Sequence, residues 1–267
     1  MSILSGQIAI VTGASSGIGE GVAKAMASEG ATVVINYPFD AIKKMAEDVL
    51  NDVLSKGGKG IIYQCDVSKE AEVKKMFADV VAQFGTVDIL VNNAGLQKDS
   101  AFINMTLDQW NTVIGINLTG QFLCAREAIR EFLRRGKSEK STAVGKIICM
   151  SSVHEKIPWA GHANYAASKG GVMMMMKTIA QEYAPHGIRI NSIAPGAIQT
   201  AINREAWETA DHLNTLLKLI PQRRIGTADD VAKAAVWLAS DDSDYVNGAT
   251  LFIDGGMTLY PGFEGNG

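Results

Sequence analysis

The prediction of the fold rests on the stretch TGASSGIG, which runs from Thr12 to Gly19. The apolar run QIAIV (7–11) precedes it, and the helical pattern EGVAKAMASEG (20–30) follows it. Glycines let a backbone turn tightly and approach a ligand, and free N–H groups at the start of a helix attract phosphate. The stretch therefore predicts a cradle for the pyrophosphate of a dinucleotide. Its residues are Gly13, Ser15, Ser16, Gly17, Ile18 and Gly19.

Short apolar runs alternate with amphipathic stretches along the whole chain. The runs lie at 7–12, 31–36, 60–65, 87–92, 145–151, 187–193 and 249–254, and the helical patterns at 17–29, 40–56, 69–84, 106–135, 163–184 and 227–240. Runs without internal alternation are typical of strands buried on both faces. We therefore predict an α/β protein with a doubly wound, seven-stranded parallel sheet of the Rossmann type, in a single dinucleotide-binding and catalytic domain over residues 1–267. Two segments do not fit this alternation of strands and helices. They are 134–145, a polar stretch expected to be a solvated loop, and 197–224.

Composition argues against several classes of protein. The 267 residues include 25 basic and 28 acidic ones, for a net charge of −3, so no nucleic-acid or membrane surface is expected. No apolar run approaches the roughly 18 residues of a membrane span, and the N-terminus lacks a basic signal region, so we expect a cytoplasmic protein. The three cysteines form no CxxC pair and the four histidines share no metal spacing, so neither a disulfide framework nor a metal site is expected.

Residues 151–171, SSVHEKIPWAGHANYAASKGG, contain the side chains of two different chemistries. Ser152, His154 and Glu155 would suit acyl transfer, but the strand-to-helix elbow of a hydrolase nucleophile is missing and the three lie too close together in sequence. Tyr165 and Lys169 are four residues apart on a helical pattern and so share one face. A Tyr base must lower its pKa by about three units, or roughly 4 kcal/mol. An ammonium about 4 Å away, at an effective dielectric near 20, supplies that much.

The motifs together resemble the short-chain dehydrogenase/reductase family. The matching residues are the TGxxxGxG loop, Asn92-Asn93-Ala94-Gly95, Asn117, Ser152, Tyr165-x-x-x-Lys169, and Pro195-Gly196 with Ile198 and Thr200. The resemblance implies that Tyr165 accepts the substrate proton while hydride passes to a nicotinamide. It also implies that Lys169 lowers the Tyr165 pKa and binds the ribose, that Ser152 binds the reacting oxygen, and that Asn117 holds a relay water.

The same resemblance implies which further residues contact the cofactor. They are Asp66 and Val67 at the adenine, Asn93, Ala94 and Gly95 along the cleft, and Pro195, Gly196, Ile198 and Thr200 near the carboxamide, together with Tyr165 and Lys169. The second strand ends in Asn36, so neither the acid that holds a 2′-hydroxyl nor the Arg that accepts a 2′-phosphate is present. Asp40, Lys43 and Lys44 lie near enough to bias the choice either way. We predict use of NAD or NADP, with a preference for NAD.

Within the family, the pieces MSSVHEKIPW, YAASKGG, EYAPHGIRIN with PGAIQTAIN, and DGGMTLYPGF resemble the bacterial glucose 1-dehydrogenases. They imply oxidation of β-D-glucose at C1 to gluconolactone, with Ser152, His154, Gln97 and Asn203 as substrate contacts. Gln97 stands where those enzymes have an acid. The alternatives are a 3-oxoacyl thioester reductase, another secondary-alcohol dehydrogenase, or a cofactor-binding regulator without turnover. A carrier-protein partner would need a basic patch, for which Arg130, Arg134 and Arg135 are candidates; the family otherwise implies a homotetramer.

Overall fold

The seven strands in the described part of the chain form one parallel sheet. The computed structural model describes residues 2–259, with the backbone only at Ile202. The strands are β1 (Ile8–Val11), β2 (Thr32–Tyr37), β3 (Lys59–Gln64), β4 (Ile89–Asn92), β5 (Gly145–Met150), β6 (Ile188–Pro195) and β7 (Thr250–Ile253). Their order, β3-β2-β1-β4-β5-β6-β7, confirms the predicted doubly wound Rossmann sheet. The domain limits of 1 and 267 stay a prediction, because Met1 and residues 260–267 lie outside the described part, as does the end of DGGMTLYPGF.

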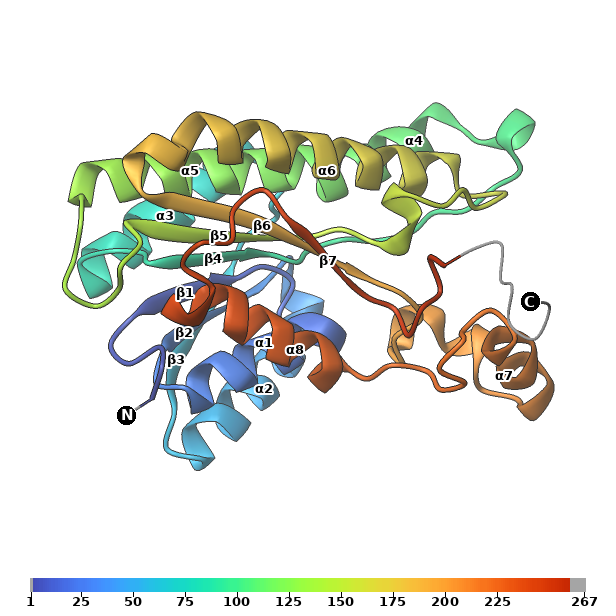
Figure 1. Ribbon diagram of the computed structural model, residues 1–267, viewed down its shortest axis with the longest axis horizontal. Helices are drawn as coiled ribbons and strands as arrows, with labels where there is room; N and C mark the ends of the chain where they lie inside the picture. The colour runs from blue at the N-terminus through green and yellow to red at the C-terminus, as the bar shows by residue number, and fades with distance from the viewer. Residues whose placement is uncertain (1, 260–267) are drawn as a thin grey trace.

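Helices cover both faces of this sheet (Figure 1). One face carries α1 (Gly17–Ser28), α2 (Lys43–Ser55) and α8 (Ala228–Ala239), and the other carries α3 (Glu70–Phe84), α5 (Gly120–Arg135) and α6 (Ala163–Tyr183). Alternate residues of a strand point to opposite faces, so Val11 and Ile35 join the core beneath α1, whereas Ile10 and Val34 join the core beneath α3 and α5. Burial of both faces explains why the strands read as unbroken apolar runs.

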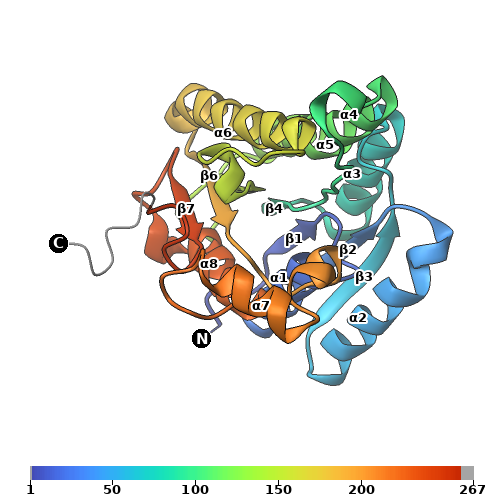
Figure 2. The ribbon, with the colours of Figure 1, turned by 90° about the vertical axis from the view of Figure 1, so that its right-hand side faces the viewer.

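The strand order reverses beside β1, and this reversal creates the site. Val11 pairs with Ile35 of β2 on one side and with Val91 of β4 on the other. The connections leaving β1 and β4 turn to opposite sides of the sheet, which opens a crevice at the carboxyl ends of the strands. The segment 197–224 forms the short helix η6 (Ala201–Ala206) and α7 (Ala210–Leu217) at this end of the molecule (Figure 2). In residues 2–259, no helix is long and apolar enough to cross a membrane.

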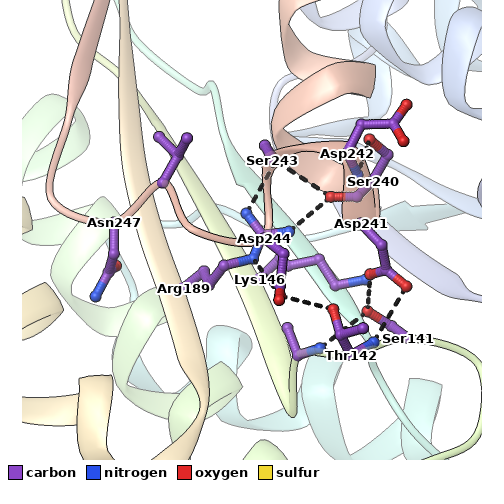
Figure 3. Close-up of polar contacts among 12 residues, drawn as sticks. Ser141, Thr142, Lys146, Arg189, Ser240, Asp241, Asp242, Ser243, Asp244 and Asn247 are labelled. Atoms are coloured by element: carbon purple, nitrogen blue, oxygen red, sulfur yellow. Dashed lines mark hydrogen bonds and ion pairs between the residues drawn. The ribbon is translucent and has the colours of Figure 1, made fainter.

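The polar segment 134–145 contains the expected loop, in which Lys137, Glu139 and Lys140 are exposed, but its two ends are anchored to other elements. Ser141 donates a hydrogen bond to Asp241 (2.5 Å) and Thr142 one to Asp244 (2.6 Å) (Figure 3). Arg135 forms an ion pair of 3.0 Å with Asp88. These polar groups bond to partners on other elements, which the sequence pattern of the loop does not reveal. The loop lies at the end of the sheet opposite α7 (Figure 1).

Two buried cations lie beside this loop (Figure 3). The Lys146 ammonium donates to the Gln7 side chain at 2.6 Å, and burial lowers the pKa of Lys146 to about 8. The Arg189 guanidinium donates to the carbonyls of Leu238 (3.1 Å) and Ser240 (2.8 Å). The Lys146 bond fastens the start of β5 to the residue before β1, and the Arg189 bonds fasten the start of β6 to the end of α8, so this end of the sheet is a structural anchor.

Candidate active site

One cleft of about 480 Å³ at the carboxyl ends of the strands contains the predicted cofactor contacts. It lies at the end of the molecule that Figure 2 faces. Its lining includes Gly13, Ser15, Ser16, Gly17, Ile18, Gly19, Asp66, Val67, Asn93, Ala94, Gly95, Tyr165, Lys169, Pro195, Gly196, Ile198 and Thr200. These side chains come from segments up to 187 residues apart in the chain, from Gly13 to Thr200, and the fold brings them to one surface.

The glycine loop has the shape that a pyrophosphate requires. Gly13 and Gly17 have φ values of +60° and +59°, in the left-handed region that favours glycine. A Cβ atom on Gly13 would lie 2.9 Å from the Ala94 Cα, and one on Gly19 would lie 2.5 Å from the Gly13 carbonyl oxygen. Helix α1 begins at Gly17, and the Ser16 side chain before it makes no capping bond, which leaves the first N–H groups of the helix for a ligand. The residues present therefore fit a dinucleotide.

Thr12 and Asn93 hold this loop against the end of β4. The Thr12 hydroxyl accepts hydrogen bonds from the backbone N–H groups of Asn93 (2.9 Å) and Ala94 (3.0 Å). The Asn93 side chain donates back to the carbonyls of Thr12 (2.9 Å) and Gly13 (3.1 Å). Sequence reasoning placed Asn93 along the cofactor but assigned Thr12 no role, although the hydroxyl at the end of the first strand was a visible signal.

Asn36, at the end of β2, is also a positioning residue. Its side-chain oxygen accepts from the Gly13 N–H at 3.1 Å, and its amide donates to the Cys65 carbonyl at 2.9 Å. These bonds tie the glycine loop to β2 and to the segment after β3. Because the Asn36 side chain is buried and its oxygen already accepts the Gly13 N–H, it is poorly placed to hold a ribose hydroxyl.

The adenosine end of the cleft is apolar rather than basic. Pro38, Phe39, Ile42 and Met45 line it. Lys44 lies outside the lining and pairs with Asp48 at 2.7 Å on the outer surface of α2. Lys169 is the one basic side chain among the described residues that line the cleft.

The catalytic residues predicted on α6 and after β5 meet at the other end of the cleft. Ser152, Tyr165 and Lys169 all line it. The Lys169 ammonium donates to the Met150 carbonyl at 2.8 Å and lies 5.4 Å from the centre of the Tyr165 ring. The residues can thus hold a substrate hydroxyl between Ser152 and Tyr165, with a cation beneath the phenol ring.

Asn117 lies behind this cleft and does not line it. The pattern 106–135, expected to be one helix, is α4 (Leu107–Ile114), a π-helical turn (Gly115–Thr119) and α5 in succession. The wider turn contains Asn117, whose oxygen accepts from the Leu96 N–H at 2.9 Å and whose amide donates to the Leu96 carbonyl (3.0 Å) and the Ser168 hydroxyl (3.2 Å). Asn117 therefore joins the loop after β4 to the helix that carries Tyr165. π-Helical turns are frequent at functional sites.

The pKa values differ from the expectation for Tyr165. Burial raises the pKa of Tyr165 above 10.0, and hydrogen bonds with Ser152 and Gln97 offset only part of that increase. Burial also lowers the pKa of Lys169 to about 8, so its ammonium group loses its proton more easily than that of an exposed lysine. Desolvation is the largest influence on both side chains, and the lowering by Lys169 stays a prediction for the site with a nicotinamide bound.

Of the three substrate contacts expected beyond Ser152, two line the cleft and one does not. Gln97 and Asn203 line the cleft, and Gln97 also hydrogen-bonds to Tyr165. His154 does not line it, because its ring stacks on Trp159 at 4.4 Å and its Nδ1 lies 3.1 Å from the Ile157 carbonyl. The opposite face of Trp159 is covered by His162 at 3.5 Å. The three stacked rings form a rigid wall beside Tyr165.

Comparisons with known proteins extend over almost the whole chain. Residues 13–258 match the family model described as enoyl-(acyl carrier protein) reductase. The chain is 46% identical to 3β-hydroxysteroid dehydrogenase 1 of Eggerthella lenta, covering 98% of this chain and 97% of that one. It is 41% identical to glucose 1-dehydrogenase 2 of Bacillus subtilis, covering 97% of each. The crystal structure of a gluconate 5-dehydrogenase from Burkholderia cenocepacia, in complex with NADP and tartrate, is 36% identical, with a TM-score of 0.88 over 96% of each chain.

Proposed function

This chain belongs to the short-chain dehydrogenase/reductase family and is an NAD(P)-dependent oxidoreductase, and from that premise we propose that it oxidises β-D-glucose at C1 to gluconolactone. The observation that carries this proposal is the position of Gln97 and Asn203, whose amide groups line the cleft together with Ser152 and Tyr165. A sugar needs polar partners for its other hydroxyl groups, and the Gln97 amide and the NH2 group of Asn203 can supply them; the Asn203 oxygen already accepts hydrogen bonds from Thr200 and Trp207. A site with such polar partners discriminates against analogues that lack the hydroxyls, because those partners would be left unpaired.

Each residue of the cleft has its own role in the proposed reaction. Ser152 donates a hydrogen bond to the C1 oxygen, and Tyr165, as the phenolate, takes the proton of the C1 hydroxyl. Bound NAD(P)⁺ supplies the acceptor for the hydride that leaves C1, together with a positive charge that favours the phenolate. Lys169 holds the ribose and keeps a cation beneath Tyr165, and Asn117 fixes α6 relative to the loop after β4. The sugar loses one hydride and one proton and becomes the lactone.

A substrate panel tests the sugar assignment. We expect D-glucose to give a higher kcat/KM than 2-deoxyglucose, xylose, a 3β-hydroxysteroid and, in the reverse direction, an acetoacetyl thioester. The reason is that each of the others leaves at least one polar group of the site without a partner. Absorbance of the reduced cofactor measures all five. Efficient turnover of the steroid or the thioester beside negligible glucose oxidation would refute the assignment and leave the catalytic residues in place.

A steroid alcohol is the second candidate, within the same class of secondary-alcohol dehydrogenases. The relative with this activity is more identical to the chain than the glucose enzyme is, at 46% against 41%. Phe102 and Ile103, in the loop after Gln97, are 75% and 91% exposed. Neither lines the cleft, but an apolar substrate that extended towards this loop would gain from such side chains, whereas glucose would not.

A reductase of thioesters on a carrier protein is less well supported. Its candidate docking residues are each paired with an acid, Arg130 with Glu127 at 2.9 Å and Arg134 with Glu131 at 2.6 Å. Arg135 pairs with Asp88. They lie at the end of α5 away from the cleft (Figure 1).

Cofactor use is predicted from the adenosine end of the cleft. We expect both cofactors to be used, with kcat/KM for NAD⁺ higher than for NADP⁺ by less than a hundredfold, because Asn36 stands where β2 would carry the selective acid and no guanidinium is among the described residues that line the cleft. Phe39→Arg should shift this ratio towards NADP⁺ by about tenfold, since Phe39 lines the cleft and a guanidinium pairs with phosphate. Lys44→Arg, outside the lining, is the matched control. A native preference beyond a hundredfold for either cofactor would mean that a determinant lies elsewhere.

We also propose the homotetramer that the family implies. Helices α5 and α6 lie side by side on the outer face of the molecule (Figure 1), where Phe122, Leu133 and Met174 are exposed. Of the run VMMMM, Val172 and Met176 are core residues and Met174 is available for a subunit contact. Sedimentation equilibrium should give about four times the 28.5 kDa of one chain; a monomer mass would contradict the proposal.

A further inference from the structure

Gln121 is a polar side chain in the apolar, sheet-facing stripe of α5. It lies in the first turn of that helix, directly after the π-helical turn, and shares a face with Cys124 and Ala128. Those two residues are fully buried, and Gln121 is buried with them. Such a stripe is ordinarily apolar, and a buried polar group in it needs a hydrogen-bond partner. The partners of Gln121 therefore indicate its role.

The Gln121 side chain bonds to the carbonyl at the end of β5. Its amide donates to the Met150 carbonyl oxygen at 3.0 Å, and the Lys169 ammonium donates to the same oxygen at 2.8 Å. A carbonyl oxygen has two lone pairs, so it can accept both bonds. One side chain of α5 and one of α6 thus meet at a single atom of the sheet.

The Met150 carbonyl lies where the support from β4 has ended. Met150 is the last residue of β5, and the ladder to β4 ends one residue earlier, at the pair Asn92 and Cys149. The peptide group of this carbonyl leads to Ser151, which directly precedes the catalytic Ser152. A rotation of the peptide would therefore move the anchor of Lys169 and the backbone before Ser152 together.

Gln121 is itself held in place from two sides. The buried Asn92 side chain, at the end of β4, donates to the Gln121 backbone carbonyl at 3.1 Å. At the preceding residue, Gly120, a Cβ atom would lie 2.7 Å from the Val67 Cγ2 atom, so the start of α5 packs closely against the segment after β3. The Gln121 amide therefore reaches the Met150 carbonyl from a fixed position.

Stability alone does not explain a glutamine at this position. The Gln121 Oε1 atom is shielded from solvent and has no hydrogen-bond partner within residues 2–259. An unpaired buried acceptor is unfavourable, and a methionine of similar size would not have one. The bond that the glutamine side chain makes in return is the one to the Met150 carbonyl.

We propose that Gln121 is a positioning residue for Lys169, whose amide fixes the Met150 carbonyl and thereby the ammonium group bound to it. The proposal rests on the role of Lys169 in the proposed function. In the described structure the Lys169 ammonium has no other hydrogen-bond acceptor, so its position depends on this one oxygen. A small displacement of a catalytic group costs rate, and here it would weaken the ribose contact as well.

Gln121→Met tests this role. Loss of the amide frees the Met150 carbonyl and with it the Lys169 ammonium, so we expect kcat to fall about tenfold and NAD⁺ to bind about fivefold more weakly. Steady-state kinetics with the best substrate of the panel and calorimetric titration of NAD⁺ measure the two quantities. Gln181→Met, at an exposed position of α6, is the matched control and should change neither. Gln121→Leu replaces the Met variant if that one fails to fold.

A double-mutant cycle separates the positioning of Lys169 from a general effect on the fold. In a Lys169→Ala background, Gln121→Met should change kcat and NAD⁺ affinity by less than about twofold, because the ammonium that it positions is gone. The same losses in both backgrounds would overturn the proposal, as would wild-type kcat and affinity in the single Gln121→Met variant. If Lys169→Ala itself kept wild-type kcat and affinity, the role of Lys169 in the proposed function would fail, and this proposal with it.

Discussion

Tyr165→Phe is expected to lower kcat by about a thousandfold or more, because removal of the phenol oxygen leaves no group in reach to accept the substrate proton. The phenyl ring should keep its edge contacts with His154 and Trp159, whose centres lie 6.3 and 6.4 Å from that of Tyr165. Cofactor affinity should therefore change by less than about twofold. Steady-state kinetics with the best substrate of the panel, together with calorimetric titration of NAD⁺, measures both quantities.

The matched control is Tyr245→Phe, which removes the same oxygen from a fully exposed tyrosine. It should leave both kcat and affinity unchanged. If the Tyr165→Phe protein kept a tenth of wild-type turnover, Tyr165 would not be the base, and another group of the cleft, such as Ser152, would have to accept the proton.

Lys169→Ala should damage two steps at once. Loss of the ammonium removes a charge from beneath the Tyr165 ring and a ligand of the ribose, so we expect kcat to fall about a hundredfold and NAD⁺ to bind at least tenfold more weakly. The bond to the Met150 carbonyl is also lost. The exposed Lys177→Ala, two turns further along α6, is the control and should retain both properties.

A Lys169→Ala protein with reduced turnover and unchanged cofactor affinity would separate the two roles. It would assign Lys169 to the proton transfer alone, and the ribose contact would have to come from elsewhere in the cleft. Thermal unfolding of the variant distinguishes either outcome from a loss of fold, since removal of a buried ammonium with a depressed pKa should not itself destabilise the core.

The sheet could be predicted from the sequence because a strand that is buried on both faces has an unbroken apolar run. Each of the seven apolar runs overlaps a strand, and the ends differ by at most two residues, as at β1 (7–12 against Ile8–Val11). The π-helical turn around Asn117 could not be predicted, because a single wide turn hardly alters the period of a long helical pattern. The anchoring of the loop 134–145 was equally hidden, because Asp241 lies 100 residues from Ser141.

The parts of the site that depend on backbone shape could be predicted from the sequence. The parts that depend on side-chain packing could not. The glycine loop and the Tyr165–Lys169 face follow from local spacing, and all of these residues line the cleft. His154 lies two residues after Ser152, yet stacking on Trp159 turns it away from the cleft. The raised pKa of Tyr165 and the depressed pKa of Lys169 come from desolvation by residues far apart in the chain, which no local pattern encodes.

The placement of β4 next to β1 has a consequence for synthesis of the chain. β1, β2 and β3 are neighbours formed from the first 64 residues, but the other edge of β1 stays bare until Ile89–Asn92 has been made. The amide of Ile8 bonds to Asp88, 80 residues later, which a ribosome adds in roughly 4–16 s. Until then β1 has an unpaired, apolar edge, which favours pairing with strands of other chains. Nascent chains halted near residue 85 should therefore bind chaperones and aggregate on release, and chains halted beyond β5 should do so far less.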